Sequence, residues 1–69
     1  MISNLRKARK KTGIRLIDAG RNVGVSESTM SLYERGKRKL PVPIAKRLAK
    51  MYGVKWEIFY EDEEDGKAS

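Results

Sequence analysis

The sequence predicts an all-α fold, a compact bundle of about five short helices. Apolar residues recur at helical intervals in several stretches, and no stretch shows a convincing strand pattern. Glycine, the usual residue just past a helix C-terminus, follows these stretches at four places: Gly13, Gly24, Gly36 and Gly53. The chain has 69 residues, which fits one domain with a small core.

The first two helices are expected over residues 1–12 and 14–23. The first is basic, and its apolar residues recur at helical spacing (Ile2, Leu5 and Ala8). Ser3 is suited to cap its start. The second has a looser apolar stripe, formed by Ile14, Ile17, Gly20 and Val23.

The third helix is expected over residues 26–35, with Ser26 accepting hydrogen bonds from its first amides. A basic loop follows at residues 37–39. Pro41 and Pro43 suit the start of a fourth helix, since a missing amide costs nothing there. This helix has an apolar face and ends at Gly53, and residues 54–60 are expected to form a short fifth helix.

Charge divides the chain into a domain at residues 1–60 and an acidic tail at residues 61–69. The domain holds 15 basic and four acidic side chains, a net charge of +11, whereas the tail carries −4. A compact body of that charge favours a polyanion such as nucleic acid, although a merely solubilising surface is the alternative. The tail lacks a hydrophobic pattern and is predicted to be disordered.

Composition argues against an enzyme. Histidine and cysteine are both absent, which removes the commonest general base and the usual zinc ligands. No glycine loop of the P-loop type is present, and no metal, cofactor or small-molecule ligand is expected.

No apolar run is long enough for a membrane helix, and residues 1–11 lack the core of a signal peptide. We therefore expect a cytoplasmic protein.

The spacing across the second and third helices indicates a helix-turn-helix. Two helices that cross steeply need a small residue where they touch, and Gly20 supplies it. The tight turn between them needs a glycine, and Gly24 follows four residues later. Val23, Val25, Met30 and Tyr33 provide an apolar seam.

Residues 13–36, GIRLIDAGRNVGVSESTMSLYERG, resemble the helix-turn-helix of the Cro and phage-repressor family, also called XRE-type regulators. Residues 45–59, AKRLAKMYGVKWEIF, are similar to the fourth and fifth helices of that family. The resemblance covers roughly residues 3–60 and implies the lambda-repressor-like DNA-binding fold. It also implies that the third helix enters the major groove of double-stranded DNA.

The resemblance assigns roles to individual residues. Base edges would be read by Glu27, Ser28, Leu32 and Ser31. For Glu27, a hydrogen bond from cytosine N4 competes with a simple first-turn role in the helix. Phosphates would be contacted by Ser26, Thr29, Tyr33, Arg35, Lys37, Arg38 and Lys39. Arg9 and Glu34 would form a partly buried structural ion pair.

The chain departs from the family at the start of the second helix. Leu16 stands where a phosphate-binding glutamine is usual, Ile17 where an acid is usual, and Ala19 replaces an internal leucine. Leu16 and Ile17 are expected either to fill the space beside Ala19 or to form an exposed patch.

The function implied is that of a sequence-specific transcriptional regulator, a repressor that binds a two-fold symmetric operator as a homodimer. The dimer interface would come from the aromatic C-terminal helix: Trp56, Ile58, Phe59 and Tyr60. Core closure is the alternative role for Trp56 and Phe59. The alternative function is a protein-interaction module of the same fold, such as an antitoxin-like or anti-repressor partner.

Overall fold

The computed structural model describes residues 3–61, which form four α-helices and one short 3-10 helix. The elements are α1 (Asn4–Thr12), α2 (Leu16–Val23), α3 (Glu27–Glu34), α4 (Val42–Tyr52) and η1 (Trp56–Tyr60). No strand occurs among these residues, so the predicted all-α fold is confirmed. The predicted acidic tail lies outside the described residues except for Glu61.

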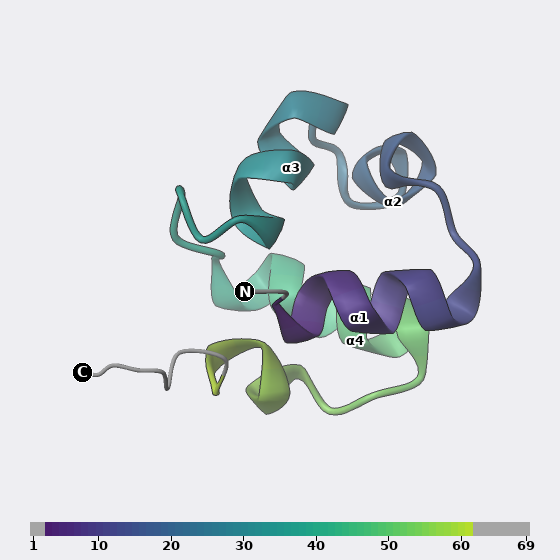
Figure 1. The fold of residues 1–69 in the computed structure, drawn as a ribbon, viewed down its shortest axis with the longest axis vertical. Helices are drawn as coiled ribbons and strands as arrows, with labels where there is room; N and C mark the ends of the chain where they lie inside the picture. Colours follow the sequence, from purple (N-terminus) through teal and green to yellow (C-terminus); the bar gives the residue numbers. More distant parts are fainter. Residues whose placement is uncertain (1–2, 62–69) are drawn as a thin grey trace.

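The elements are arranged so that α2 and α3 lie together at one end of the molecule and η1 lies at the other (Figure 1). Helices α1 and α4 lie between the two ends and contact each other. The described chain measures 33 × 23 × 21 Å along its principal axes. The two ends are therefore available to different partners.

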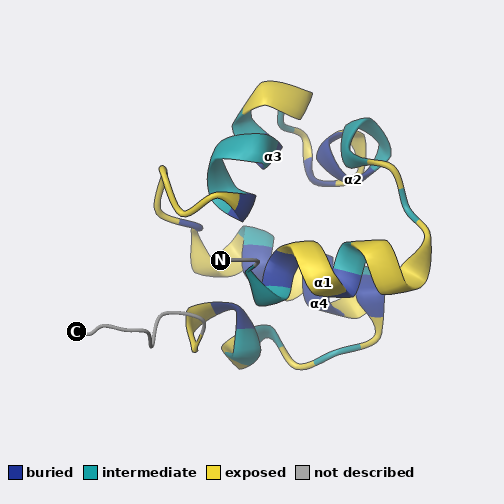
Figure 2. Cartoon of the chain, viewed as in Figure 1, coloured by how far each residue is buried: buried dark blue, intermediate teal, exposed yellow. Residues whose placement is uncertain are grey.

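A single hydrophobic core joins all five elements (Figure 2). Met30 of α3 and Leu48 of α4 are the largest side chains that are fully buried. The other buried apolar residues come from α1, α2, α4, η1 and the loop before α4: Leu5, Ala8, Ala19, Val23, Leu40, Ala45, Ala49, Tyr52 and Phe59. The predicted short fifth helix thus closes the core through Phe59.

The four α-helices end in the same way, which sets where the next element can begin. In each, the residue after the terminal glycine donates its amide to a carbonyl five residues earlier: Ile14 to Arg9, Val25 to Gly20, Lys37 to Leu32, and Val54 to Ala49. This is the Schellman motif. Because Ile14 and Val54 serve the preceding helices, α2 and η1 begin two residues later than the sequence predicts.

The segment η1 is held by polar contacts as well as by Phe59. The Asn4 side-chain amide donates to the Ile58 carbonyl at 2.8 Å, which ties η1 to the start of α1. The Tyr60 hydroxyl donates to the Leu40 carbonyl at 2.6 Å, which ties it to the loop before α4. The fifth element is a 3-10 helix of five residues rather than an α-helix.

Candidate nucleic-acid interface

The crossing of α2 and α3 depends on Gly20. A Cβ atom at Gly20 would lie 2.7 Å from the Val25 carbonyl oxygen and 3.2 Å from Cγ of Met30. The nearer neighbour is backbone, so it cannot turn away as a flexible side chain would. Only a residue without a side chain lets the two helices approach this closely, as the sequence predicts.

The turn between the helices is only three residues long and is fixed at both ends. Gly24 adopts φ +77°, a left-handed conformation that L side chains rarely take, and ends α2. Ser26 begins α3 as its cap: its Oγ accepts the Thr29 amide at 3.1 Å and donates to Thr29 Oγ1 at 3.0 Å. The expected capping role of Ser26 is thus present, and α3 starts at a fixed angle to α2.

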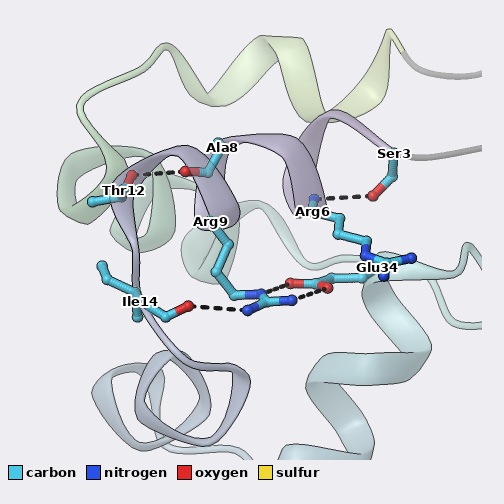
Figure 3. Close-up of polar contacts among 7 residues, drawn as sticks. All are labelled: Ser3, Arg6, Ala8, Arg9, Thr12, Ile14 and Glu34. Atoms are coloured by element: carbon cyan, nitrogen blue, oxygen red, sulfur yellow. Dashed lines mark hydrogen bonds and ion pairs between the residues drawn. The ribbon is translucent and has the colours of Figure 1, made fainter.

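The far end of α3 is attached to α1 by the ion pair between Arg9 and Glu34 (Figure 3). Arg9 donates from Nε to Oε2 at 2.6 Å and from Nη2 to Oε1 at 3.2 Å, a two-point contact. Its Nη1 donates to the Ile14 carbonyl at 3.0 Å. The two side chains are only 12% and 5% exposed, so one arginine joins α1, the loop before α2 and α3 within the interior.

The residues assigned to base reading lie together on the outer face of α3. Glu27 and Ser28 are exposed in its first turn, and Ser31 and Leu32 are half-buried further along (Figure 2). All four line one open hollow of about 410 Å³, which is completed by Leu16 and Arg35. The face is therefore mixed, with two leucines, two hydroxyls, one carboxylate and one guanidinium.

The residues assigned to phosphate contact fall into separate groups. Ser26 and Thr29 are bonded to each other within the helix cap. Arg35 lines the hollow beside α3, whereas Lys37, Arg38 and Lys39 form the exposed loop that follows. Tyr33 is half-buried against the core and lines a second hollow, of about 400 Å³, together with that loop.

Acidic side chains do little to offset the positive charge at this end of the molecule. Glu34 is engaged by Arg9, and the exposed Asp18 is bonded by Arg15 at 2.9 Å. The hydrogen bond from Arg15 lowers the pKa of Asp18, which favours its ionised form beside the arginine. Among residues 3–61, Glu27 is the one acid on the outer face of α3 that has no ion-pair partner.

Sequence reasoning left Leu16 with two roles, and the structure gives it parts of both. It packs partly against the core, and it also lines the hollow beside Glu27, Ser28, Ser31 and Leu32. A smaller hollow of about 220 Å³ adjoins, and Leu16 lines it with Arg6, Arg9, Ser31, Glu34 and Arg35. The signal in the sequence for this position of Leu16 was an apolar residue at the start of a helix, where a polar one is usual.

The aromatic C-terminal residues differ in their exposure. Phe59 is 7% exposed and lies in the core of its own chain, so the expected dimer contact through Phe59 has no side-chain surface to use. Trp56 and Ile58 are half-buried, whereas Tyr60 is 40% exposed. Trp56 makes two contacts: the Nζ of Lys46 lies 5.4 Å from its ring centre, and the ring of Tyr60 packs against it at a steep angle of 79°.

A metal-binding cluster and a membrane-spanning helix are both absent from the described part of the chain. Residues 3–61 contain no group of three histidine, cysteine, aspartate or glutamate side chains that could hold a metal ion. None of the helices within this range has the length and apolar character needed to cross a bilayer.

Comparison with known proteins links this geometry to one family. A family model for a helix-turn-helix domain matches residues 3–57. Over 49 residues the chain is 39% identical to a protein of Pyrobaculum aerophilum whose name proposes an HTH-type transcriptional regulatory protein. That stretch is 71% of this chain but 20% of the relative, so the likeness concerns one small part of the larger protein.

Proposed function

Because the chain belongs to the helix-turn-helix domain family, we propose that it is a sequence-specific DNA-binding transcriptional regulator. The name of the Pyrobaculum aerophilum relative supports the same class of function. The observation that carries the proposal is the outer face of α3. It presents side chains able to read bases, is held at a fixed angle by Gly20 and by Arg9, and is flanked by basic residues.

In this function α3 enters the major groove, which is roughly 12 Å wide and admits one helix. Glu27, Ser28, Ser31 and Leu32 read base edges from their shared hollow. Positive charge at the end of α3 and in the following loop contacts the sugar-phosphate backbone: Arg35, Lys37, Arg38 and Lys39. Ser26, Thr29 and Tyr33 contribute shorter polar contacts to phosphates.

The regulator acts as a repressor and binds a two-fold symmetric operator as a homodimer. Exposed apolar surface at the η1 end supports this assembly, because Tyr60 of η1 is 40% exposed. Trp56 and Ile58 add half-buried surface to the same end. Contact through η1 leaves the opposite end of the molecule, with α2 and α3, uncovered for DNA (Figure 1).

Selection of bound duplexes from a random pool tests this function directly. The expected result is a palindromic consensus with half-sites about one turn of DNA apart. Recovery of no consensus would contradict sequence-specific binding. A consensus without symmetry would contradict the homodimer alone.

Salt titration and two substitutions test how the contacts divide. Affinity for the selected duplex is expected to fall steeply between 50 and 300 mM salt, because each phosphate contact releases counterions from the DNA. Arg38→Ala should weaken all duplexes alike, whereas Ser28→Ala should change the preferred sequence. The reverse pattern would show that backbone and base contacts have been exchanged.

A further inference from the structure

The start of α2 contributes an apolar wall to the hollow beside α3. Leu16 is the first residue of α2, and Leu32 belongs to the last turn of α3. Both are half-buried and line the same hollow of about 410 Å³. Leu16 packs against the core as well, whereas Leu32 is not among the half-buried residues that do so.

We propose that Leu16 and Leu32 together form a pocket for the C5-methyl group of thymine, which makes Leu16 a specificity-determining residue. This rests on the proposed function, since it requires α3 to lie in the major groove. Of the four standard bases, only thymine presents a methyl group on that side of DNA, and apolar side chains are the groups that contact it.

The polar members of the hollow fit the rest of the thymine edge. Beside its methyl group thymine presents O4, which accepts hydrogen bonds. The hydroxyls of Ser28 and Ser31 line the same hollow and can donate to that atom. Two apolar walls next to two hydroxyl donors therefore match a methyl group next to an acceptor.

The charged members of the hollow limit the other bases it can take. The Glu27 carboxylate only accepts hydrogen bonds, so it disfavours any base acceptor beside it, N7 and O6 of guanine as well as O4 of thymine, and the thymine O4 therefore faces Ser28 and Ser31. Arg35 supplies the positive charge that a nearby phosphate requires. A thymine inside the hollow, with a cytosine or adenine amine facing Glu27 at a neighbouring base pair, satisfies all of these groups.

Replacement of thymine by deoxyuridine in the selected duplex removes the methyl group and leaves base pairing and O4 unchanged. Single replacements along each half-site are expected to weaken binding of the unchanged protein about fourfold at one or two positions, as burial of one methyl group predicts. In Leu16→Ala and in Leu32→Ala this difference should shrink to less than about twofold.

The comparison is insensitive to partial unfolding, since each variant is measured on both duplexes and only their ratio is used. Ile17→Ala is the matched control: Ile17 is a half-buried neighbour in α2 that lines neither hollow beside α3, so its variant should keep the full ratio.

Equal binding of thymine and uracil at every position would overturn the proposed pocket while leaving DNA binding intact. A ratio that persists in both leucine variants would also overturn it. Failure of the chain to bind any selected duplex would instead contradict the proposed function, and the pocket with it.

Discussion

At the scale of single residues, Glu34 is the position at which a small change should be most costly. Glu34→Gln keeps the shape of the side chain but leaves the Arg9 guanidinium, 12% exposed, without an opposite charge. Loss of one partner from a buried pair is expected to lower the free energy of unfolding by about 3 kcal/mol. Urea denaturation followed by circular dichroism measures this change.

The exposed pair between Arg15 and Asp18 provides the control. Its side chains are 77% and 42% exposed, so water screens the attraction, and Asp18→Asn should leave the denaturation midpoint almost unchanged. Equal shifts for the two variants would mean that the interior pair contributes no more than a surface pair.

Replacement by phenylalanine is expected to have opposite effects on stability at Tyr52 and at Tyr60. The Tyr52 hydroxyl is buried and finds no hydrogen-bond partner among residues 3–61, whereas the Tyr60 hydroxyl donates to Leu40. Tyr52→Phe should therefore preserve the free energy of unfolding or raise it by about 1 kcal/mol, and Tyr60→Phe should lower it by about 1 kcal/mol. Urea denaturation of both variants measures the two free energies of unfolding, and a larger loss in Tyr52→Phe than in Tyr60→Phe would contradict the prediction.

The same tyrosines make the fold sensitive to alkaline pH. Burial raises the pKa of Tyr60, and burial followed by the nearby Glu34 charge raises that of Tyr52 well above its usual range. In the unfolded chain a tyrosine ionises near pH 10, so above that pH the unfolded state binds fewer protons and the stability falls. Denaturation midpoints should drop from pH 9 to pH 11, and by less in Tyr52→Phe. An equal drop in that variant would assign the effect to other groups.

At the scale of elements, the contact between α2 and α3 is the one that a single methyl group should disrupt. Gly→Ala within a helix ordinarily adds stability. At Gly20 the added Cβ would meet the Val25 carbonyl at 2.7 Å, so Gly20→Ala should instead lower the free energy of unfolding by about 2 kcal/mol. Thermal unfolding tests this, with Asn22→Ala at an exposed position of the same helix as control. A stabilised Gly20→Ala would show that the helices can move apart.

Sequence patterns predicted most of the elements because glycines mark their ends. The predicted roles of Ser3 and Ser26 as helix caps, and of Gly20 at the crossing of α2 and α3, are also confirmed. Two helix starts were predicted too early, because a sequence does not show that the amides of Ile14 and Val54 serve the preceding helix.

The residues on the outer face of α3 could be predicted from the sequence, but the shape of the hollow that they line could not. The resemblance to the Cro and phage-repressor family assigned Glu27, Ser28 and Leu32 to this face, and helical periodicity alone did not. The contribution of Leu16 to their hollow depends on the angle between α2 and α3, and the bond from Tyr60 to Leu40 depends on the path of the whole chain. Local sequence spacing encodes neither the angle between the helices nor the path of the chain.

At the scale of the whole molecule, size and shape suit side-by-side binding on DNA. The long axis of the described chain runs from α2 and α3 to η1, so it points away from the DNA (Figure 1). The other two dimensions, 23 and 21 Å, are shorter than one turn of DNA, about 34 Å. Two chains can therefore occupy successive major grooves on one face of the duplex without overlap.

Net charge is also a property of the whole molecule, because the negative charge of residues 61–69 offsets part of the positive charge of residues 1–60. Removal of this segment raises the net charge from +7 to +11 and should tighten binding to random duplex DNA. Fluorescence anisotropy at several salt concentrations measures the change. A full-length variant with its five acids replaced by amides should behave like the truncated chain; if neither differs from the parent, the segment does not offset the domain electrostatically.

The bond between Arg9 and Glu34 also sets how the molecule opens. This non-covalent contact closes the stretch of chain from residue 9 to residue 34, which contains all of α2 and α3, while the residues that follow depend on other contacts. Fluctuations that break this closure release both helices together rather than one at a time. The slowest-exchanging amide hydrogens of α2 and α3 should therefore share one opening free energy, so that the two helices unfold as one cooperative unit.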